Sequence, residues 1–263
     1  MTSPVFRAAA PESERASVAQ LERRFDAMVQ AVIPIGVALL AARDRPHMLE
    51  TILLAAKALC RADGGTLYLR TEDDQLEFVM LRNDSLGINM GGASGVPVPY
   101  PPLPLRDPAS GAPNERNVAT WTALSGRSVN IADAYQADGF EFSGTLAFDR
   151  LTGYRSTSFL TVPLKNGEQR VIGVLQLINA TDPETGQVVP FDAGDLPVIE
   201  ALSTLAAAAL EVFVREERMR SEIRCLHVQI DETKRARQVA EITDSDYFQS
   251  LQKKLRVLRA RPS

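Results

Sequence analysis

Few side chains in this sequence could carry out acid–base, nucleophilic or metal chemistry. The histidines are His47 and His227, and the cysteines are Cys60 and Cys225. An enzyme must bring a nucleophile, an acid and a base together, yet both histidines fall in segments predicted to be helices outside the sheet region. The cysteines are far apart and lack the spacing of a metal site or of a disulfide framework. We therefore expect no catalysis and no bound metal, with Cys60 as a buried helix residue.

The composition excludes several other classes of protein. The chain has 29 Lys and Arg against 33 Asp and Glu, and its net charge of −4 lacks the basic excess of a nucleic-acid-binding protein. The apolar runs at 31–42 and 201–214 are shorter than the ~20 residues that span a bilayer, and no signal-peptide pattern opens the chain. The sequence predicts a cytoplasmic protein with no membrane insertion and no nucleic-acid partner.

Two segments precede the predicted sheet. Residues 1–16 have no apolar periodicity and are expected to form a disordered tail. Within 17–43, apolar residues recur at three- and four-residue steps, which is typical of a dimerisation helix, and Pro34 predicts a kink or a restart. These apolar residues are Val18, Leu21, Phe25, Met28, Val32, Ile35 and Leu39. A second helix is expected at 46–62, with Pro46 in its first turn.

Short apolar runs in the middle of the chain predict an antiparallel sheet. They are 66–69, 76–81, 128–131, 157–164 and 170–178. Polar turn clusters at 71–74 and 165–168 join neighbouring runs into hairpins. With helices before and after these strands, the predicted fold class is α+β with a central antiparallel sheet.

Proline is concentrated between the second and third of these strands. The segment 96–104 holds five prolines. Such density favours extended polyproline II structure and excludes regular strand pairing. The segment is either a plain surface loop or a lid over a pocket, because long loops in compact domains are often functional.

From Asp192 onward the sequence predicts helix almost to its end. A row at three- and four-residue steps, apolar except for Glu216 and Thr233, continues from Leu205 to Thr233. This pattern favours a coiled coil with a second copy over 214–242. A short basic helix is expected at 243–263. Its Tyr247 and Phe248 are either a docking segment for a partner or a cap of the coiled coil.

The central motifs resemble the GAF domain family. They are 130–135 (Asn-Ile-Ala-Asp-Ala-Tyr), 148–156 (Phe-Asp-Arg-Leu-Thr-Gly-Tyr-Arg-Ser), 162–164 (Val-Pro-Leu) and 171–179 (Val-Ile-Gly-Val-Leu-Gln-Leu-Ile-Asn). The resemblance covers about 44–213 and is closest to the GAF domains of cyclic-nucleotide phosphodiesterases, bacterial adenylate cyclases and HD-type phosphohydrolases. It implies a six-stranded antiparallel sheet with helices on both faces, flanked by long N- and C-terminal helices. Independently, Gly153 and Gly173 predict a turn and a close backbone approach, and Asp133 is expected to cap a short helix.

The resemblance also implies a ligand site between the sheet and the helices on one face. A helix near 117–124 would offer backbone N–H groups to a phosphate, as helix starts do. By aligned position the site residues are Asn83, Asp84, Val118, Ala119, Tyr135, Ser156 and Gln176. Cyclic AMP and cyclic GMP are the candidate ligands, and for each residue a purely structural role is the alternative.

One signature of the family is incomplete. Asn179, Phe191 and Asp195 match its pattern of Asn-Lys, a spacer, Phe, three residues and Asp-Glu, but Ala180 stands at the Lys position and Leu196 at the Glu position. A Lys–Asp pair cannot form there, which leaves a rebuilt site or an absent site as alternatives.

The expected function is that of a non-catalytic signalling module. It would bind a small molecule and relay its state through the helices of a homodimer to a separate output protein of cyclase, kinase or phosphatase type. The residues after 213 are too few and too helical to form a catalytic domain. The alternative is a dimeric interaction scaffold with an unliganded pocket.

Overall fold

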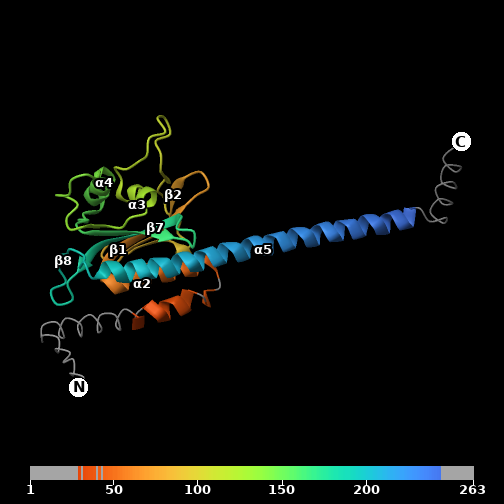
Figure 1. The fold of residues 1–263 in the computed structure, drawn as a ribbon, viewed down its shortest axis with the longest axis horizontal. Helices are drawn as coiled ribbons and strands as arrows, with labels where there is room; N and C mark the ends of the chain where they lie inside the picture. The colour runs from red at the N-terminus through yellow and green to blue at the C-terminus, as the bar shows by residue number, and fades with distance from the viewer. Residues whose placement is uncertain (1–28, 31, 40, 43, 244–263) are drawn as a thin grey trace, which may run out of the picture. The chain divides into compact units, whose positions relative to one another are not determined.

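An antiparallel sheet lies at the centre of the fold (Figure 1). The computed structural model describes residues 29–30, 32–39, 41–42 and 44–243, and its strands join in one eight-stranded sheet. The main path runs β3–β2–β1–β7–β6–β5, while the two-residue strands β4 and β8 pair with β2 and β7. The strands are β1 (Ala62–Arg70), β2 (Gln75–Asn83), β3 (Ile88–Gly91), β4 (Leu103–Pro104), β5 (Val129–Ile131), β6 (Phe159–Lys165), β7 (Val171–Thr181) and β8 (Val188–Val189). The main path has the six strands that the resemblance implied, and β4 and β8 extend it.

Two hairpins of this sheet follow from the turn residues of the sequence. β1 and β2 pair around the predicted turn at 71–74, where Asp74 adopts a left-handed φ of 57°. β6 and β7 pair around Asn166, whose side-chain oxygen accepts two backbone N–H groups at 3.1 and 2.9 Å. Both predicted hairpins are confirmed, with strands somewhat longer than the apolar runs.

The short strand β4 corrects the expectation that prolines exclude 96–104 from the sheet. Leu103 and Pro104 pair with Leu76 and Gln75 at the start of β2. Proline lacks a backbone donor but is tolerated at a sheet edge, where only one side of the strand is paired. The preceding residues, 96–102, form no strand.

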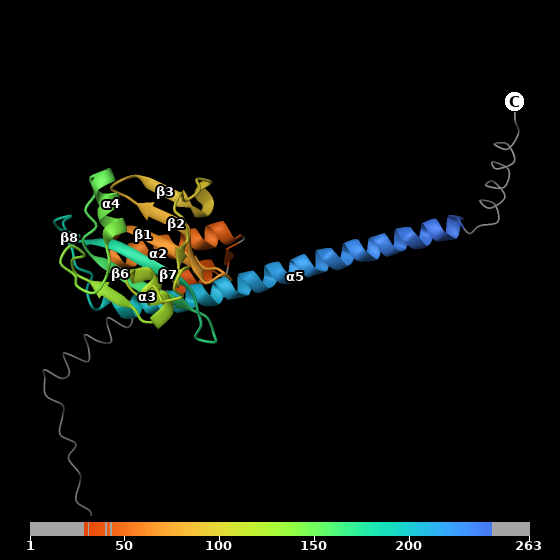
Figure 2. The ribbon, with the colours of Figure 1, turned by 90° about the horizontal axis from the view of Figure 1, so that it is seen from above.

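Helices cover both faces of the sheet (Figure 2). α2 (Arg45–Cys60) and the first turns of α5 (Asp195–Thr243) lie on one face, and α3 (Val118–Ser125) and α4 (Ser143–Thr152) lie on the other. A short 3₁₀-helix, η1 (Gly92–Ser94), follows β3. The helices α2, α3 and α5 occur where the sequence predicts helix.

The local sequence explains why α2 is predictable and α4 is not. Asp44 begins α2, because its carboxylate accepts the N–H of His47 at 2.9 Å. α4 begins at Phe142 without a capping side chain, and the one buried residue within it is the polar Asp149. A helix without a capping side chain has no start signal in the sequence.

The first turns of α5 share an apolar core with α2 and the sheet. Ile199, Leu202 and Ala206 of α5 are fully buried, as are Ile52 and Leu53 of α2. In the part of the chain described, the segment Asp195–Glu216 is long and apolar enough to cross a membrane. This is weak evidence for a membrane span, because the core helix of a globular domain has the same composition.

The described residues up to Glu211 form one compact unit, and the described residues from Val212 onward form a second. In the second unit, α5 continues as a helix to Thr243, and its Val212, Met219 and Ile223 side chains are exposed by 49, 47 and 53%. The predicted basic helix with Tyr247 and Phe248 lies outside the described residues, as do the side chains of Cys225 and His227.

A helical segment before α2 packs within the first unit. Residues 29–30 and 32–39 are helical, Pro34 included, and Val32 and Leu39 of the predicted seam are buried in the same chain. Ile33 and Val37 on the same segment are exposed by 58 and 62%. The predicted tail at 1–16 and the seam residues up to Met28 lie outside the described part.

The predicted roles of Gly153 and Gly173 are confirmed, whereas that of Asp133 is corrected. A Cβ at Gly173 would lie 2.5 Å from the carbonyl oxygen of Tyr68, and Gly153 ends α4 with a φ of 72°. Asp133 caps a turn instead of a helix, because its carboxylate accepts the N–H of Tyr135, two residues on, at 2.9 Å. Such a local hydrogen bond offers the backbone an alternative to helix.

Candidate functional site

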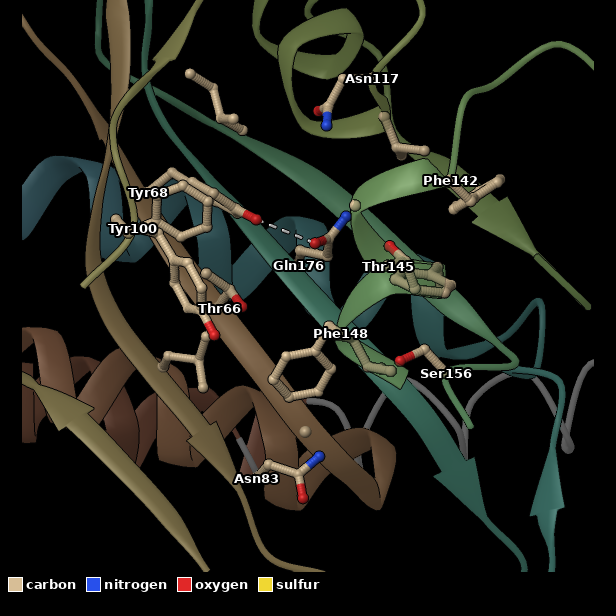
Figure 3. Close-up of a pocket in the computed structure, with 18 of the residues that line it drawn as sticks. Thr66, Tyr68, Asn83, Tyr100, Asn117, Phe142, Thr145, Phe148, Ser156 and Gln176 are labelled. Carbon is tan, nitrogen blue, oxygen red and sulfur yellow. Dashed lines mark hydrogen bonds between the residues drawn. The ribbon is translucent and has the colours of Figure 1, made fainter. Parts of the chain in front are cut away.

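A cavity of about 260 Å³ lies between the sheet and the elements that cover its α3–α4 face (Figure 3). Thr66 and Tyr68 of β1 and Gln176 of β7 line it from the sheet. Thr145 and Phe148 line it from α4. The volume is just below the roughly 300–1,000 Å³ of sites for drug-sized ligands, so the cavity suits a small molecule of a few rings.

Aromatic rings form much of the cavity wall. Tyr68 and Phe78 have ring centroids 4.7 Å apart, and Phe78 and Tyr100 have centroids 5.5 Å apart. Tyr100 comes from the proline-rich segment, which therefore contributes to the cavity as a lid would. Tilted ring pairs of this kind present flat apolar surfaces on which another ring can stack.

A second ring pair lies beside the cavity, on α3. Trp121 meets Phe140 edge to face, with centroids 5.8 Å apart. Trp121 belongs to the same helix as the cavity residue Val118, and Phe140 precedes the cavity residues Glu141 and Phe142. Movement of either wall would change this contact.

Gln176 is held in one orientation at the centre of the sheet. The Tyr68 hydroxyl donates to its Oε1 at 3.2 Å, and its Nε2 donates to the Thr161 hydroxyl at 3.3 Å. Burial raises the pKa of Tyr68 above its usual range, so Tyr68 is a neutral donor. An amide has two donor hydrogens and two acceptor lone pairs, so one of each remains for a ligand. The predicted placement of Gln176 in a binding site agrees with this geometry.

The predicted anion site at the start of α3 differs from the observed arrangement. The Asn117 side-chain oxygen accepts the N–H groups of Ala119 and Thr120 at 2.9 and 3.2 Å. Val118 lines the cavity, but Ala119 is buried in the core beside Tyr68 and does not. The N–H of Ala119 is therefore already satisfied by its own helix cap.

Asn83 ends β2 and Asp84 follows it, and the two side chains have different partners. Asn83 is buried and lines the cavity, and its Oδ1 accepts the N–H of Leu86 at 2.8 Å. Asp84 does not line the cavity and instead pairs with the buried Lys57 of α2 at 2.5 Å. Of this predicted pair, only Asn83 is placed to meet a ligand.

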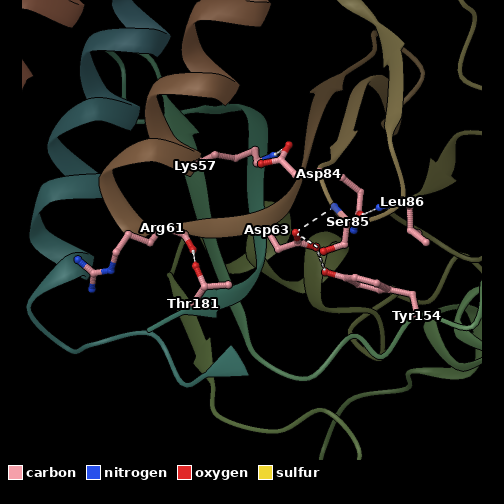
Figure 4. Close-up of polar contacts among 9 residues, drawn as sticks. Lys57, Arg61, Asp63, Asp84, Ser85, Leu86, Tyr154 and Thr181 are labelled. Atoms are coloured by element: carbon pink, nitrogen blue, oxygen red, sulfur yellow. Dashed lines mark hydrogen bonds and ion pairs between the residues drawn. The ribbon is translucent and has the colours of Figure 1, made fainter. Parts of the chain in front are cut away.

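A polar network joins the start of β1 to a cavity residue (Figure 4). The Asp63 carboxylate accepts the Tyr154 hydroxyl at 2.5 Å and the Ser85 hydroxyl at 2.7 Å. Burial, followed by the bond to Asp63, raises the pKa of Tyr154 above its usual range. Tyr154 therefore lines the cavity as a neutral ring fixed at its polar end.

Asp149 of α4 accepts hydrogen bonds from two further residues that were predicted to belong to the site. It is buried, and its carboxylate accepts the Tyr135 hydroxyl at 2.6 Å and both the N–H and the hydroxyl of Ser156 at 2.8 Å. Ser156 lines the cavity, whereas Tyr135 does not and instead stacks under Arg155 at 4.0 Å. Tyr135 thus positions α4 rather than contacting the cavity.

The signature residues have structural roles. Asn179 adopts a φ of 57°, its Oδ1 accepts the N–H groups of Thr157 and Ser158 at 2.7 and 3.2 Å, and its Nδ2 donates to the Arg155 carbonyl at 2.8 Å. Phe191 is buried, and Asp195 begins α5.

The two departures from the signature are consistent with this structural role. Ala180 is buried in β7, and its N–H donates to the Ser158 hydroxyl at 3.1 Å. Leu196 lies in the first turn of α5, after Asp195. Neither Ala180 nor Leu196 lines the cavity.

The charged residues at the cavity direct their charges elsewhere. Arg82 pairs with Gly65 across β1 and β2. A Cβ added at Gly65 would contact Leu53 of α2, so this position faces α2. The Arg82 guanidinium donates to Glu50 of α2 at 2.5 Å. Its charge therefore lies on the other face of the sheet. Glu141 is exposed and lies 4.0 Å from Arg116. Among the described lining residues, no other is charged at neutral pH.

Among the side chains that the structure describes, Cys60 and His47 lie away from this cavity. Cys60 is buried at the end of α2, where burial raises the pKa of its thiol, and His47 is exposed beside Asp44. Within the described ranges, no three His, Cys, Asp or Glu residues are placed to hold a metal ion.

Several cavity residues were missed by the sequence analysis. They include the rings of Tyr68, Phe78, Tyr100 and Phe148. Side chains alternate between the two faces of a strand, so Thr66 and Tyr68 of β1 share one face. Thr66 lies directly opposite Gln176 in the sheet, and this pairing could have identified both residues as part of the site. Phe148 had no such signal, because α4 itself was not predicted.

Comparison with known proteins identifies the family of this fold. A family model for the GAF domain matches residues 44–210. Dual 3′,5′-cyclic-AMP and -GMP phosphodiesterase 11 of Drosophila melanogaster is 43% identical over 67 residues, which are 26% of this chain and 4% of that protein. The corresponding phosphodiesterase 11A of Takifugu rubripes is 39% identical over 64 residues, 24% of this chain and 7% of that protein. The chain therefore spans only a small part of the length of these curated relatives.

Solved structures agree on the fold. The GAF domain of a phosphoenolpyruvate-protein phosphotransferase from Coxiella burnetii matches with a TM-score of 0.53 at 14% identity, over 73% of this chain and 96% of that one. The equivalent domain from Acinetobacter matches with a TM-score of 0.51 at 15% identity, over 72 and 97% of the two chains. Domains of this kind are generally regulatory, small-molecule-sensing modules rather than enzymes. Because the family model covers more than half of its length, the chain belongs to the GAF domain family.

Proposed function

We propose that this protein is a non-catalytic signalling module that binds a small molecule in the cavity and relays its state to a separate output protein. The observation that carries the proposal is the cavity itself, in which aromatic walls surround a few fixed polar groups such as Gln176, Thr66 and Ser156. Apolar walls with a small number of oriented polar groups are typical of ligand sites. The output protein would be of cyclase, kinase or phosphatase type.

The helix α5 supports the relay part of the proposal. Its first turns belong to the core beneath the sheet, while Val212, Met219 and Ile223 are exposed at spacings of seven and four residues. This spacing is typical of a seam that packs against a second copy of the same helix. A homodimer joined by α5 would connect ligand binding at the sheet to the contact between protomers.

A thermal-shift screen of the purified chain tests the binding part. The panel contains cyclic AMP and cyclic GMP, for which the two curated relatives are named, together with cyclic dinucleotides, purines and amino acids. At a concentration 100 times its Kd, a ligand stabilises the folded state by about 2.7 kcal/mol, which raises the melting temperature by roughly 5–10 °C in a domain of this size.

The variants Gln176→Ala and Asp84→Ala locate the binding. Gln176→Ala is expected to weaken a stabilising ligand by about tenfold, because it removes a buried hydrogen-bonding group from the cavity. Asp84→Ala is expected to bind normally, since Asp84 lies outside the cavity and pairs with Lys57. Gln187→Ala, at an exposed glutamine, is the matched control. A ligand that binds Gln176→Ala unchanged would disprove binding in this cavity.

A dimeric scaffold with an unliganded cavity is the second candidate. It is favoured by Ala180, which stands where the family signature has lysine and so removes the Lys–Asp pair. A protein that forms a dimer but is stabilised by no compound of the panel would be such a scaffold.

A further inference from the structure

Among the residues that the structure describes, none directs a positive charge at an anion inside the cavity. Arg82 directs its guanidinium to Glu50 on the α2 side of the sheet, and Arg116 lies outside the cavity, beside the exposed Glu141. Apart from Arg82 and the exposed Glu141, the polar and aromatic side chains that line the cavity are neutral hydroxyls, amides and rings. Burying an ionised group without a partner of opposite charge is strongly unfavourable.

Three of the backbone N–H groups in the first turn of α3 already have partners. A helix start binds an anion through N–H groups that have no partner within the helix. Here the N–H groups of Ala119 and Thr120 both donate to Asn117 Oδ1, at 2.9 and 3.2 Å. The N–H of Trp121 donates to the Asn117 carbonyl at 2.9 Å. A bound phosphate would have to displace the Asn117 side chain before it could use two of these groups.

The polar groups that are available suit the edge of a neutral heterocycle. Gln176 has one donor hydrogen and one acceptor lone pair left after its bonds to Tyr68 and Thr161. A glutamine amide with this pattern forms paired hydrogen bonds with a ring that has an adjacent donor and acceptor, as with N6 and N7 of adenine. Tyr100 and Phe78 supply flat surfaces for such a ring.

The geometry points to an uncharged planar heterocycle, of the purine base or nucleoside class, as the ligand of this cavity. Gln176 hydrogen-bonds to the edge of this ring, and the ligand binds without a phosphate. This inference rests on the proposed function, because it names the chemical class of ligand for the same site. The uncharged interior and the capped start of α3 then select against nucleotides, while the rings and Gln176 select for the base.

Calorimetric titration of the full chain with matched pairs of compounds tests the inference. The pairs are adenosine with cyclic AMP, and guanosine with cyclic GMP, which differ only in the phosphate. At least one nucleoside is expected to bind about tenfold or more tightly than its cyclic monophosphate, because the phosphate must be buried without a counter-charge.

The outcomes separate this inference from the proposed function. If neither nucleoside binds more tightly than its own cyclic monophosphate, the inference is overturned and small-molecule sensing stays intact. Absence of binding by all four compounds also overturns it, and the wider thermal-shift panel then decides the proposed function independently.

Two variants test the reasons given for this selectivity. Asn117→Gly removes the side-chain cap and frees the N–H groups of Ala119 and Thr120, with little loss of helix stability because glycine is a tolerated N-cap. It is expected to raise the affinity for cyclic AMP relative to adenosine by about fivefold or more. An unchanged ratio would show that the cap does not exclude the phosphate, contrary to the inference. Gln176→Ala is expected to weaken adenosine about tenfold relative to Gln187→Ala, and equal affinities would overturn the role of Gln176.

Discussion

At the scale of single residues, side chains that a family pattern marks as functional divide into two groups. Gln176 and Asn83 are directed at the cavity, whereas Asn179 and Tyr135 hold the backbone and α4 that surround it. The difference lies in the hydrogen bonds, which sequence alone does not contain. A side chain whose polar atoms are all bound to the backbone has nothing left to offer a ligand.

Asn179→Ala is expected to lower the free energy of unfolding by about 2–4 kcal/mol, since it leaves the part-buried N–H of Thr157 and the buried N–H of Ser158 without an acceptor. Alanine also tolerates the left-handed φ at this position poorly. Urea unfolding followed by circular dichroism measures the change. A loss below about 0.5 kcal/mol, which is typical of surface positions, would contradict the structural role.

Tyr68 and Tyr154, whose pKa values burial raises, make the protein sensitive to alkali. Below the pKa of a free tyrosine, about 10, both folded and unfolded chains keep the phenol protons. Above it the unfolded chain loses them while the folded chain retains them on Tyr68 and Tyr154, so stability falls as pH rises. Each group contributes a slope of up to about 1.4 kcal/mol per pH unit.

Unfolding measured between neutral pH and the alkaline range is expected to show this fall, and Tyr68→Phe should make the fall shallower. The phenylalanine variant loses the bond to Gln176 and is therefore less stable at neutral pH as well. An alkaline slope identical to that of the unchanged protein would refute the assignment of a raised pKa to Tyr68.

At the scale of elements, prediction succeeded where the chain has both a periodic apolar pattern and residues that mark a turn or a helix end. β1, β2, β6 and β7 combine apolar runs with turn residues such as Asp74 and Asn166, and α2 has Asp44 as its cap. α4, β3, β4 and β8 lack these signals, since α4 has no cap and β4 and β8 have two residues each.

The predicted site residues were likewise placed correctly in some cases and wrongly in others. Of the seven predicted site residues, Asn83, Val118, Ser156 and Gln176 line the cavity, and Asp84, Ala119 and Tyr135 do not. Asp84 and Tyr135 lie just outside strands, where no alternation fixes the direction of a side chain. Ala119 lies on the core face of α3, and without the orientation of that helix its neighbour Val118 could not be distinguished from it.

Gly173 gives the clearest test at this scale. Gly173→Ala is expected to destabilise the fold by about 1–3 kcal/mol, because the added methyl group would lie 2.5 Å from the Tyr68 carbonyl oxygen, within the β1–β7 pair. Gly167→Ala is the matched control, since an added Cβ there would lie 4.0 Å from the Glu211 carboxylate. Thermal unfolding of both variants measures the difference, and equal melting temperatures would contradict the close approach of β1 and β7.

At the scale of the whole molecule, α5 contributes to two different environments. Its first turns are buried in the unit that contains the sheet, and its later turns expose Val212, Met219 and Ile223 to solvent. Exposed apolar side chains in such a row are unfavourable for an isolated helix and favourable for one that has a partner.

The dimer proposal predicts which of these side chains matter. Light scattering of the full chain is expected to give twice the mass of one chain, and the combined change Met219→Ser and Ile223→Ser should reduce it to a single chain, because both lie on the seam. Val214→Ser is the matched control, since Val214 is also exposed but lies off the seam. Dissociation by Val214→Ser alone, or none by the seam changes, would exclude this seam.

The edge-to-face pair of Trp121 and Phe140 gives the molecule its own optical probe. Trp121 is the one tryptophan of the sequence, so all of the indole fluorescence of the chain comes from α3. Phe140, the ring that the indole contacts, directly precedes the cavity residues Glu141 and Phe142. The helix α3, which carries Trp121, begins with the cavity residue Val118. Occupancy of the cavity, and rearrangement of the α3 cap, would therefore register in the emission spectrum of the unlabelled protein.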